Sequence, residues 1–479
     1  MEFAARIGYG LLTALIACAA TGAPPLLAAT STVRDIPPTT TLLNPNGVNF
    51  DDFGASVALS DDGRVLLVGA PETIENTVSG GLAQVGRVYV FLRGDRHFDT
   101  RPARRLDDPD PVALDEFGAR VALSENGRTA LVSASGGDTG VARVFVFDSA
   151  DGSLLATLES PDNGADCFGQ SLALSATGDV ALVSANCAEI AGLRWAGKVY
   201  VYARDGGGWS PTPLAVLTEP VPARNDFFGT GVALSDDGNT ALIGSDNYSS
   251  DDPVGRAYVF TRSGGNWQPA PSGVLSDPEH TPGSMFGSTV ALSGDGNTAL
   301  VGAGNAGDGH AAHVFQRNQG QWSHAGALNA ATDRIGTGFV NTVKMSTHGD
   351  TALVGRLTGT GVVQTFAHDG GGTWPQQTSH FMNNPTATNG DAYGWSAALS
   401  MDGRIRVVGA PYAVAQSAPA GSLFSAMPGP GRVYIYNLQE DGDTDTAGHA
   451  GASNGGVLLL LCVLSWLLRR RHRHGGFVL

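Results

Sequence analysis

The sequence predicts an all-β fold, a closed ring of seven four-stranded sheets that a strand from the N-terminal region completes. Three observations predict it: a short segment recurs seven times, each copy contains strand patterns separated by glycine turns, and the last copy lacks its fourth strand. The composition agrees, because 66 glycines and only 15% charged residues suit short strands joined by tight turns.

The recurring segment begins with an aromatic residue and has a glycine ten positions later. FGASVALSDDGRVLLVGAP, residues 53–71, returns as YGWSAALSMDGRIRVVGAP at residues 393–411. Successive copies lie 51 to 64 residues apart, which favours four-stranded units with variable loops over a tightly stacked solenoid. The copies start at Phe53, Phe117, Phe168, Phe228, Phe286, Phe339 and Tyr393.

Each copy predicts its strands in order. SVALS alternates between apolar and polar residues, VLLVGA is continuously apolar, and the DDG between them predicts a hairpin turn whose glycine takes a positive φ. A third strand follows as GRVYVF and its variants. A weaker fourth strand surrounds a leucine three residues before a proline, as in Leu106 with Pro109.

The fourth strand also predicts how the ring closes. The last copy ends after RVYIYNL without such a strand, whereas TTLLNP, with Leu42 and Pro45, precedes the first copy. An N-terminal strand that completes the last blade would remove the open sheet edges. We therefore predict one seven-bladed β-propeller within residues 30–440.

The repeats resemble FG-GAP repeats, the units of the integrin α-subunit propeller and of many bacterial surface proteins. The Phe-Gly at the start and the VGAP at the end of the segment carry this resemblance, most closely in the first and last copies and least in the sixth. The resemblance implies a propeller that binds ligands or partners through the loops on one face, with no common reaction.

An acidic and a basic position recur together in five copies. An Asp stands two residues before the aromatic residue, and an Arg or Lys opens the third strand; copies five and six lack both. We expect the two positions to touch, within a blade or between neighbours, as scaffold ion pairs that each contribute about 0–1 kcal/mol where exposed. The expected pairs are Asp51 with Arg87, Asp115 with Arg143, Asp166 with Lys198, Asp226 with Arg256, and Asp391 with Arg432.

Two of the four cysteines, Cys167 and Cys187, flank the hairpin of the third copy. Counting outward from its turn places them opposite each other, so a disulfide that suits an exported protein is expected there. Two free thiols are the alternative, because a bridge must also meet strict geometry.

Calcium is the metal that integrin-like blades would imply. It needs several oxygen ligands and a glycine bend, and the DDG turns have too few carboxylates. The best loops are SDNYSSDD and NAGDGH, and solvated acidic turns are the alternative to a metal site. The candidate ligands are Asp246, Asp251, Asp252 and Asp308.

The loops after the GAP position vary most, and a rigid ring would position them for recognition. The longest span residues 71–85, 186–196 and 411–430. Aromatic and Arg side chains are frequent at binding hot spots, although Trp195 could equally fill space between blades. The candidate contact residues are Arg194, Trp195, Tyr248, Tyr412 and Phe424.

Both ends resemble processing signals. Residues 1–29 predict a signal peptide, with cleavage after Ala19 or Ala29, or a lipoprotein signal ending at Cys18. Residues 441–454 predict a flexible acidic spacer. Residues 455–479 combine Gly-Gly, a short apolar run and a basic tail; they resemble the bacterial GlyGly-CTERM sorting signals, with a plain membrane anchor as the alternative.

These observations predict an exported bacterial protein of the periplasm, the outer cell surface or the surroundings. A net charge of −16 argues against nucleic acid as a partner. A recognition module for a protein or glycan is the first hypothesis, with transient membrane contact through the C-terminal segment. A hydrolase or lyase with acids around the central channel, and a structural envelope protein, are the alternatives. A titratable cluster at the channel mouth would favour the enzyme, and an aromatic loop patch would favour binding.

Overall fold

The computed structural model describes thirteen stretches of the chain: residues 34–48, 50–76, 82–137, 140–162, 166–247, 254–304, 310–329, 339–357, 360–368, 374, 378–387, 390–413 and 429–438. The chain divides into residues 1–34 and residues 35–479, and the described structure belongs to the second unit apart from Arg34. The predicted signal peptide, acidic spacer and C-terminal sorting segment therefore lie outside the described residues. Within the described stretches, no helix is long and apolar enough to cross a membrane.

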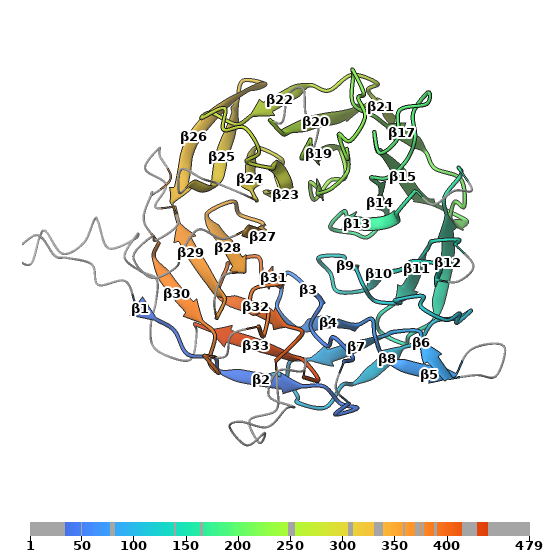
Figure 1. Ribbon diagram of the computed structural model, residues 1–479, viewed down its shortest axis with the longest axis vertical. Helices are drawn as coiled ribbons and strands as arrows, with labels where there is room; N and C mark the ends of the chain where they lie inside the picture. Colours follow the sequence, from blue (N-terminus) through green and yellow to red (C-terminus); the bar gives the residue numbers. More distant parts are fainter. Residues whose placement is uncertain are drawn as a thin grey trace, which may run out of the picture. The chain divides into compact units, whose positions relative to one another are not determined.

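Seven antiparallel sheets, the blades, follow one another around a central axis, and the first strand of each repeat lies innermost (Figure 1). The first three blades are β3 (Ser56–Leu59), β4 (Val65–Ala70), β7 (Arg87–Leu92) and β8 (Arg104–Leu106); β9 (Val121–Leu123), β10 (Thr129–Ala134), β11 (Arg143–Asp148) and β12 (Leu154–Glu159); and β13 (Phe168–Leu174), β14 (Val180–Ala185), β15 (Lys198–Asp205) and β17 (Ala215–Leu217).

The remaining blades keep the same order. They are β18 (Val232–Leu234), β19 (Thr240–Ser245), β20 (Arg256–Ser263) and β22 (Gly273–Ser276); β23 (Phe286–Leu292), β24 (Thr298–Ala303), β25 (His310–Asn318) and β26 (Gln321–Asn329); β27 (Phe339–Met345), β28 (Thr351–Leu357), β29 (Val362–Ala367) and β30 (His380–Asn383); and β31 (Ser396–Leu399), β32 (Ile405–Ala410), β33 (Arg432–Asn437) and β2 (Thr40–Leu43).

Five short strands stand outside this scheme. β5 (Ile74–Asn76) and β6 (Leu82–Gln84) pair as a hairpin between β4 and β7. β16 (Gly208–Trp209) pairs antiparallel with the end of β15, and β21 (Asn266–Trp267) pairs antiparallel with the end of β20. β1 (Arg34–Asp35) is a fifth strand of the blade 6 sheet, beside β30, and the Ile36 amide after it donates a hydrogen bond to the Phe381 carbonyl at 3.0 Å.

The ring closes as predicted, because β2 forms the outer strand of blade 7. Leu42 lies opposite Val433 in the antiparallel register, and the blue β2 runs beside the red β33 in Figure 1. Leu42 is fully buried. The predicted seven-bladed propeller of four-stranded blades is confirmed, and so is the closing N-terminal strand.

The recurring serine and glycine make the turn between the first two strands. In the first copy, Ser60 Oγ donates to Asp62 Oδ1 at 2.7 Å and accepts from the Val65 amide at 2.9 Å. Gly63 has a φ of 65°, and a side chain there would meet Ile405 of the neighbouring blade. The turn therefore needs glycine for two reasons, backbone conformation and space.

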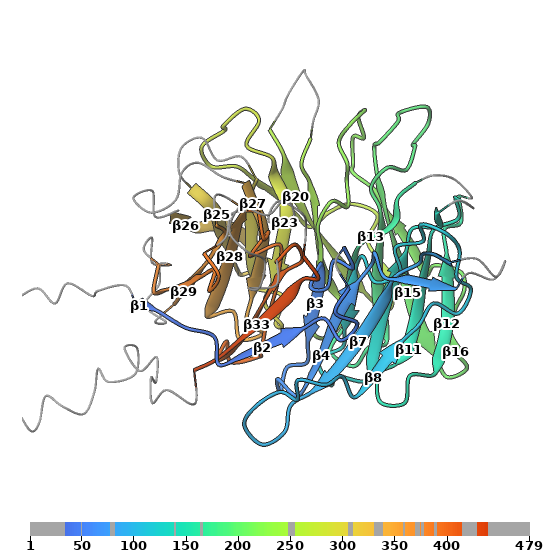
Figure 2. The ribbon, with the colours of Figure 1, turned by 60° about the horizontal axis from the view of Figure 1, so that its bottom comes forward.

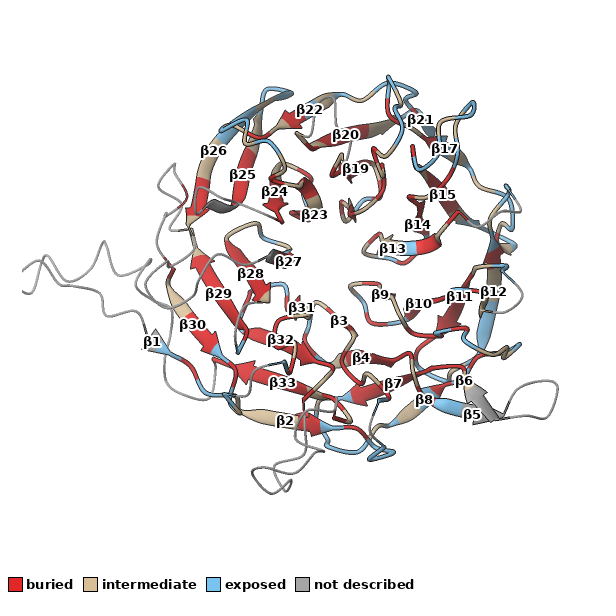
Figure 3. Ribbon diagram, viewed as in Figure 1, coloured by how far each residue is buried: buried red, intermediate tan, exposed pale blue. Residues whose placement is uncertain are grey.

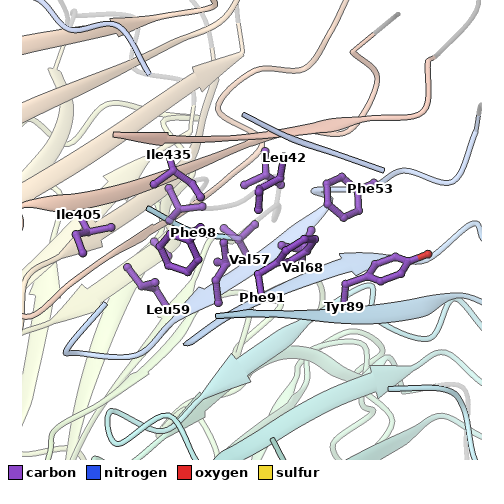
Figure 4. Close-up of a cluster of buried hydrophobic side chains, with 14 of the residues drawn as sticks. Leu42, Phe53, Val57, Leu59, Val68, Tyr89, Phe91, Phe98, Ile405 and Ile435 are labelled. Atoms are coloured by element: carbon purple, nitrogen blue, oxygen red, sulfur yellow. The ribbon is translucent and has the colours of Figure 1, made fainter. Parts of the chain in front are cut away.

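The core lies between the blades. Seven clusters of buried apolar side chains are present among the described residues, and each joins the facing sheets of two adjacent blades. Figure 3 shows the middle strands buried and the outer strands and loops exposed, and Figure 2 shows the blades from the side. In the cluster that closes the ring, Leu42 and Ile435 of blade 7 lie beside Phe53 and Phe91 of blade 1 (Figure 4).

Leu42→Ala should lower the free energy of unfolding by about 2–5 kcal/mol, because it opens a cavity at the junction of the first and last blades. Leu43→Ala is the matched control, since Leu43 is 59% exposed and should change stability by less than about 0.5 kcal/mol. Urea denaturation of the purified variants measures both. Equal effects of the two substitutions would contradict the role of β2 in closing the ring.

Candidate functional site

Two kinds of loop leave the blades on the same side. Because neighbouring strands are antiparallel, the loops that enter a first strand and those that join the second and third strands share one face, here called the loop face. The serine and glycine turns lie on the opposite side, the turn face. Arg194, Trp195 and Tyr412, the predicted contact residues that the structure describes, all lie on the loop face.

A cavity of about 670 Å³ opens on the loop face at blade 3. Arg194 and Trp195, two of the predicted contact residues, both line it. Acidic and basic side chains therefore share the cavity with an aromatic ring. Its lining residues are Asp162, Asp166, Cys187, Glu189, Arg194, Trp195 and Lys198.

Trp195 is an exposed aromatic surface rather than a plug between blades. Its side chain is 46% exposed, and its ring stacks on Phe227 with centroids 6.1 Å apart and planes 12° apart. The Phe227 amide donates to the Trp195 carbonyl at 2.9 Å. The backbone at Trp195 has a φ of 59°, which is uncommon for a residue other than glycine. Phe227 of blade 4 thus supports one face of the Trp195 indole, and almost half of the residue stays exposed.

A disulfide anchors the loop that carries Trp195. Cys167 and Cys187, the predicted pair, are bonded in the structure with Cα atoms 5.3 Å apart. The Gly197 amide donates to the Ala188 carbonyl at 3.0 Å, which ties the two ends of the loop together. The loop is therefore held at its base independently of any ligand.

The predicted pair of Arg143 with Asp115 forms, the charge of Arg87 acts on Asp51 as predicted, and acids of the preceding loops join the pattern. Arg143 bonds Asp115, with Nη2 and Oδ2 3.2 Å apart, but it also bonds Asp110 at 2.6 Å. Lys198 instead bonds Asp162, while the expected partner Asp166 accepts from Ser160 and from the Phe168 amide. In blade 1, Arg87 bonds the loop acid Asp107 at 2.9 Å. An acid one to four residues past the fourth strand therefore competes for the base.

The five repeated aspartates are buried, which corrects the picture of exposed pairs. Their exposed fractions run from 0% to 5%. A buried carboxylate needs hydrogen bonds as well as a charge partner, because desolvation penalises the charged form. The buried acids are Asp51, Asp115, Asp166, Asp226 and Asp391.

These aspartates have a second recurrent partner that sequence reasoning missed. Asn44 Nδ2 donates to Asp51 Oδ2 at 3.0 Å, and Asn384 Nδ2 donates to Asp391 Oδ2 at 3.2 Å. The partner is the residue directly before the fourth-strand proline, six or seven positions ahead. The sequence did carry a signal for this partner, because a polar residue stands directly before the fourth-strand proline in each of these copies. The equivalent residues are Asn44, Asp108, Ser160, Glu219, Asp277 and Asn384.

In blades 2 and 4 this partner is itself an acid. Burial, followed by the hydrogen bond with Asp115, raises the pKa of Asp108 to about 7. Burial and the neighbouring Asp226 likewise raise the pKa of Glu219 to about 7, although Tyr258 and Ser245 donate hydrogen bonds that oppose the shift. Each acid pair therefore holds a proton in the neutral range in place of a second negative charge.

Only one predicted calcium ligand lies in the described part of the chain. Asp246 is 7% exposed, and Thr230 Oγ1 lies 3.4 Å from its Oδ1. Burial raises the pKa of Asp246 to about 6. Asp251, Asp252 and Asp308 lie outside the described residues, as do Tyr248 and Phe424. Within the described stretches, no three His, Cys, Asp or Glu side chains are grouped to hold a metal.

Tyr412 lies beside Trp395 on the same face, with ring centroids 6.1 Å apart. Burial raises the pKa of Tyr412, and the nearby Asp52 and Glu72 add to the shift. Trp395 immediately follows the Tyr393-Gly394 pair of the last copy and was not among the predicted residues. The comparison of copies could have found it, since the residues at this position in the other copies are small or amides.

On the turn face, backbone hydrogen bonds join the inner turns of adjacent blades. The Asp61 amide donates to the Glu125 carbonyl at 3.0 Å, and the Ala176 amide donates to the Asp236 carbonyl at 3.0 Å. The Asp236 amide donates to Gly294 at 2.9 Å. The residue after each turn serine therefore stands at this mouth of the channel.

Three of these residues bring carboxyl groups together. Burial raises the pKa of Glu125 to about 9, helped by its hydrogen bond with Asp236 and the charge of Asp61. Burial also raises the pKa of Asp61, while Thr347 Oγ1 donates to its Oδ1 at 2.9 Å and opposes the shift. The group is the compact cluster of titratable side chains that the enzyme alternative requires.

Two segments of the chain match a known repeat family. Residues 39–91 and 212–260 match the FG-GAP repeat. Each matched segment runs from the fourth strand of one blade to the third strand of the next, β2 to β7 and β17 to β20. The sequence repeat is thus offset by one strand from the structural blade, which is the offset that closes the ring.

One curated protein and two solved structures are also similar to this chain. Integrin alpha-5 of Xenopus laevis is 34% identical over 110 residues, a stretch that covers 21% of this chain and 10% of the integrin. The chain thus matches about a tenth of that relative's length. The Cps50 (Swd1) β-propeller domain of Myceliophteria thermophila superposes with a TM-score of 0.52 at 13% identity, over 84% of this chain and 99% of that one.

A second structural relative is a chain of a mitotic checkpoint complex. It has a TM-score of 0.50 at 13% identity, over 87% of this chain and 96% of that chain. At this identity both structures support the propeller fold alone.

Replacing both Cys167 and Cys187 by Ser should lower the free energy of unfolding by about 3 kcal/mol, because the bridge closes a loop of 20 residues in the unfolded chain. Thermal denaturation with and without dithiothreitol measures this. The reductant should destabilise the wild type and leave the double variant unchanged. If the melting temperature of the wild type were the same with and without dithiothreitol, although the reductant had cleaved the bridge, the stabilising role of the bridge would be contradicted.

Glu125→Gln should flatten the pH dependence of stability. Because the folded pKa of Glu125 is raised from 4.5 to about 9, the folded protein binds the proton more tightly, so its contribution to stability is present below about pH 4.5 and is lost as the pH rises toward 9. Gln keeps a neutral hydrogen-bonding group, so the variant should gain stability over the wild type at the alkaline end. Urea titrations across this range measure the difference, with the exposed Glu159→Gln as control; parallel curves for Glu125→Gln and wild type would contradict the shared proton.

Proposed function

We propose that the chain is an exported recognition module that binds a protein or glycan through the loop face at blades 3 and 4. The FG-GAP repeats and the integrin-like segment support an extracellular or surface role. The signal-like residues 1–29 and the sorting-like residues 455–479 support export from a bacterium to the periplasm, the outer surface or the surroundings. The C-terminal segment would contact the membrane only until it is processed.

The observation that carries the proposal is the open face of Trp195. A half-exposed indole that a neighbouring ring supports offers apolar area at little cost in side-chain entropy. The cavity beside it supplies Arg194 and Lys198 as well as acids for polar contacts. The disulfide and the backbone bonds to blade 4 hold this surface in place before a partner arrives.

A hydrolase or lyase is the second candidate because of the cluster of Asp61, Glu125 and Asp236. Glu125 with its raised pKa could donate a proton, and Asp61 could act as the second carboxyl. The test is whether the protein releases soluble product from envelope polysaccharide. Release by the wild type but not by Glu125→Gln would support this candidate. A structural envelope role would follow if neither binding nor turnover were found.

Trp195→Ala should weaken capture of the partner from native cell envelopes at least tenfold, since truncating a central aromatic contact removes a hot spot. Leu154→Ala is the matched control, because Leu154 is 44% exposed on the outer strand of blade 2. Immobilised wild type and both variants are compared by crosslinking and quantitative mass spectrometry, with glycan fractions tested in parallel. Equal recovery of every protein and glycan on Trp195→Ala and wild type would overturn the proposal.

A further inference from the structure

A second cavity lies on the central axis of the ring. It has a volume of about 330 Å³, within the range of small-molecule sites, and every blade contributes to its wall. The blades contribute, in order, Val57, Arg120, Gln170, Thr230, Thr289, Lys344 and Trp395, among other residues. None of these residues lines the Trp195 cavity, so the two sites are separate.

Lys344 is an exception among the seven inner strands. Five residues after the aromatic start of each copy, six copies have alanine and the sixth copy has lysine. The alanines lie in or against the apolar clusters between the blades, whereas Lys344 lines the axial cavity. Lys344 has no hydrogen bond or ion pair with any described residue; the surrounding channel wall desolvates its ammonium group and lowers its pKa, although the residue is still accessible to solvent. The alanines are Ala58, Ala122, Ala173, Ala233, Ala291 and Ala398.

Arg120 adds a second cation to the wall. Its Nε donates to the Gln170 carbonyl at 3.0 Å and its Nη1 donates to the Ala119 carbonyl at 2.9 Å. These two bonds orient the guanidinium and leave Nη2 without a partner among the described residues. Burial lowers the pKa of Arg120, and only the charge of Glu116 opposes that shift. A desolvated cation whose charge Glu116 offsets only in part favours an incoming anion.

The acids of the channel are at its other end. Asp61, Glu125 and Asp236 lie at the turn face, where they bond one another and Thr347. None of them pairs with Arg120 or Lys344 in the described structure. Arg120 lies at the loop-face end of the channel, and Lys344 lies deeper, on β27 two residues before the turn serine Ser346. An anion that enters from the loop face therefore meets both cations before the acidic group of the turn face.

The neutral part of the wall favours a hydroxylated ligand. Asn186, Gln170, Ser171 and Thr230 supply amide and hydroxyl groups. Trp395 supplies the one aromatic ring, and Asn341 Nδ2 donates to its carbonyl. Sugar hydroxyls bond amides and alcohols, and the apolar face of a pyranose packs on an indole.

We propose that the central channel binds a sugar that carries a carboxylate, with Arg120 and Lys344 on the carboxylate and the amides and Trp395 on the ring. The free monosaccharide and the terminal unit of a longer glycan share this chemistry. The site goes beyond the recognition proposed for the Trp195 surface and does not depend on it.

Isothermal titration calorimetry with D-glucuronate tests the site, using the purified full chain. The wild type should bind glucuronate, and Lys344→Ala, which restores the residue of the other copies, should bind about 10- to 100-fold more weakly because one charged contact is lost. Arg120→Gln should lose affinity by a similar factor. Arg64→Ala is the matched control, because it removes a charge that is largely exposed on the turn face.

Further arms separate the alternatives. Glucose should not bind measurably and acetate should bind more weakly than glucuronate, because each lacks half of the recognised group. A glucuronate-terminated oligosaccharide that binds more tightly than the monosaccharide would assign the site to glycan ends, and equal affinities would assign it to the free sugar. Trp195→Ala should bind glucuronate with the affinity of the wild type. The two proposals can therefore fail independently of each other.

Two outcomes would overturn the proposal. The first is wild-type glucuronate affinity in both Lys344→Ala and Arg120→Gln while each variant keeps its wild-type melting temperature. The second is equal affinity for glucose, acetate and glucuronate, or no binding of glucuronate or its oligosaccharide by the wild type.

Discussion

The ring depends on how closely the second strand of one blade approaches the start of the next. Gly69 at the end of β4 lies so near the carbonyl of Gly118 that a Cβ would stand 2.1 Å from that oxygen, and Gly409 of blade 7 meets Gly54 of blade 1 at the same distance. Ser56 Oγ and Ser396 Oγ bond these two carbonyls at 2.7 Å. Glycine is required at these two contacts, because a side chain there would collide with the backbone of the next blade. The equivalent positions of blades 2 and 3 are Ser133 and Ser184, so a small side chain is accommodated there.

The same constraint separates scaffold from function. Close packing limits the residues at the blade contacts to small ones, so every copy has Gly or Ser at this position of the second strand. The loop face is free of this demand, and it is where the copies differ most, in the disulfide-anchored loop of Trp195 and in the loop of Tyr412. The inner strands show the same division on a smaller scale, since one lysine among six alanines changes the chemistry of the channel without disturbing a blade.

Charge is distributed unevenly in this acidic chain. The repeated aspartates are buried beneath the loop face, where the residue before each fourth-strand proline satisfies them or shares their proton. A second acidic group closes the channel at the turn face. In a protein whose net charge is −16, Lys344 has no ion pair with a described residue and Arg120 has only the charge of Glu116 nearby, which gives the channel a preference for anions.

The sequence by itself determined the propeller. Hydrophobic alternation, the glycine turns and the displaced fourth strand around Leu42 report local geometry that every copy repeats, so seven blades and their closure could be read directly. The sequence also predicted the Cys167–Cys187 disulfide, because both residues flank one hairpin and lie opposite each other when counted from its turn. Only the tertiary structure decided the partners of the buried aspartates and the meeting of Arg120, Lys344 and Trp395 at the axis. Arg120, Lys344 and Trp395 come from different blades and are separated by 51 residues or more. Their proximity is a property of ring closure, which no local pattern encodes.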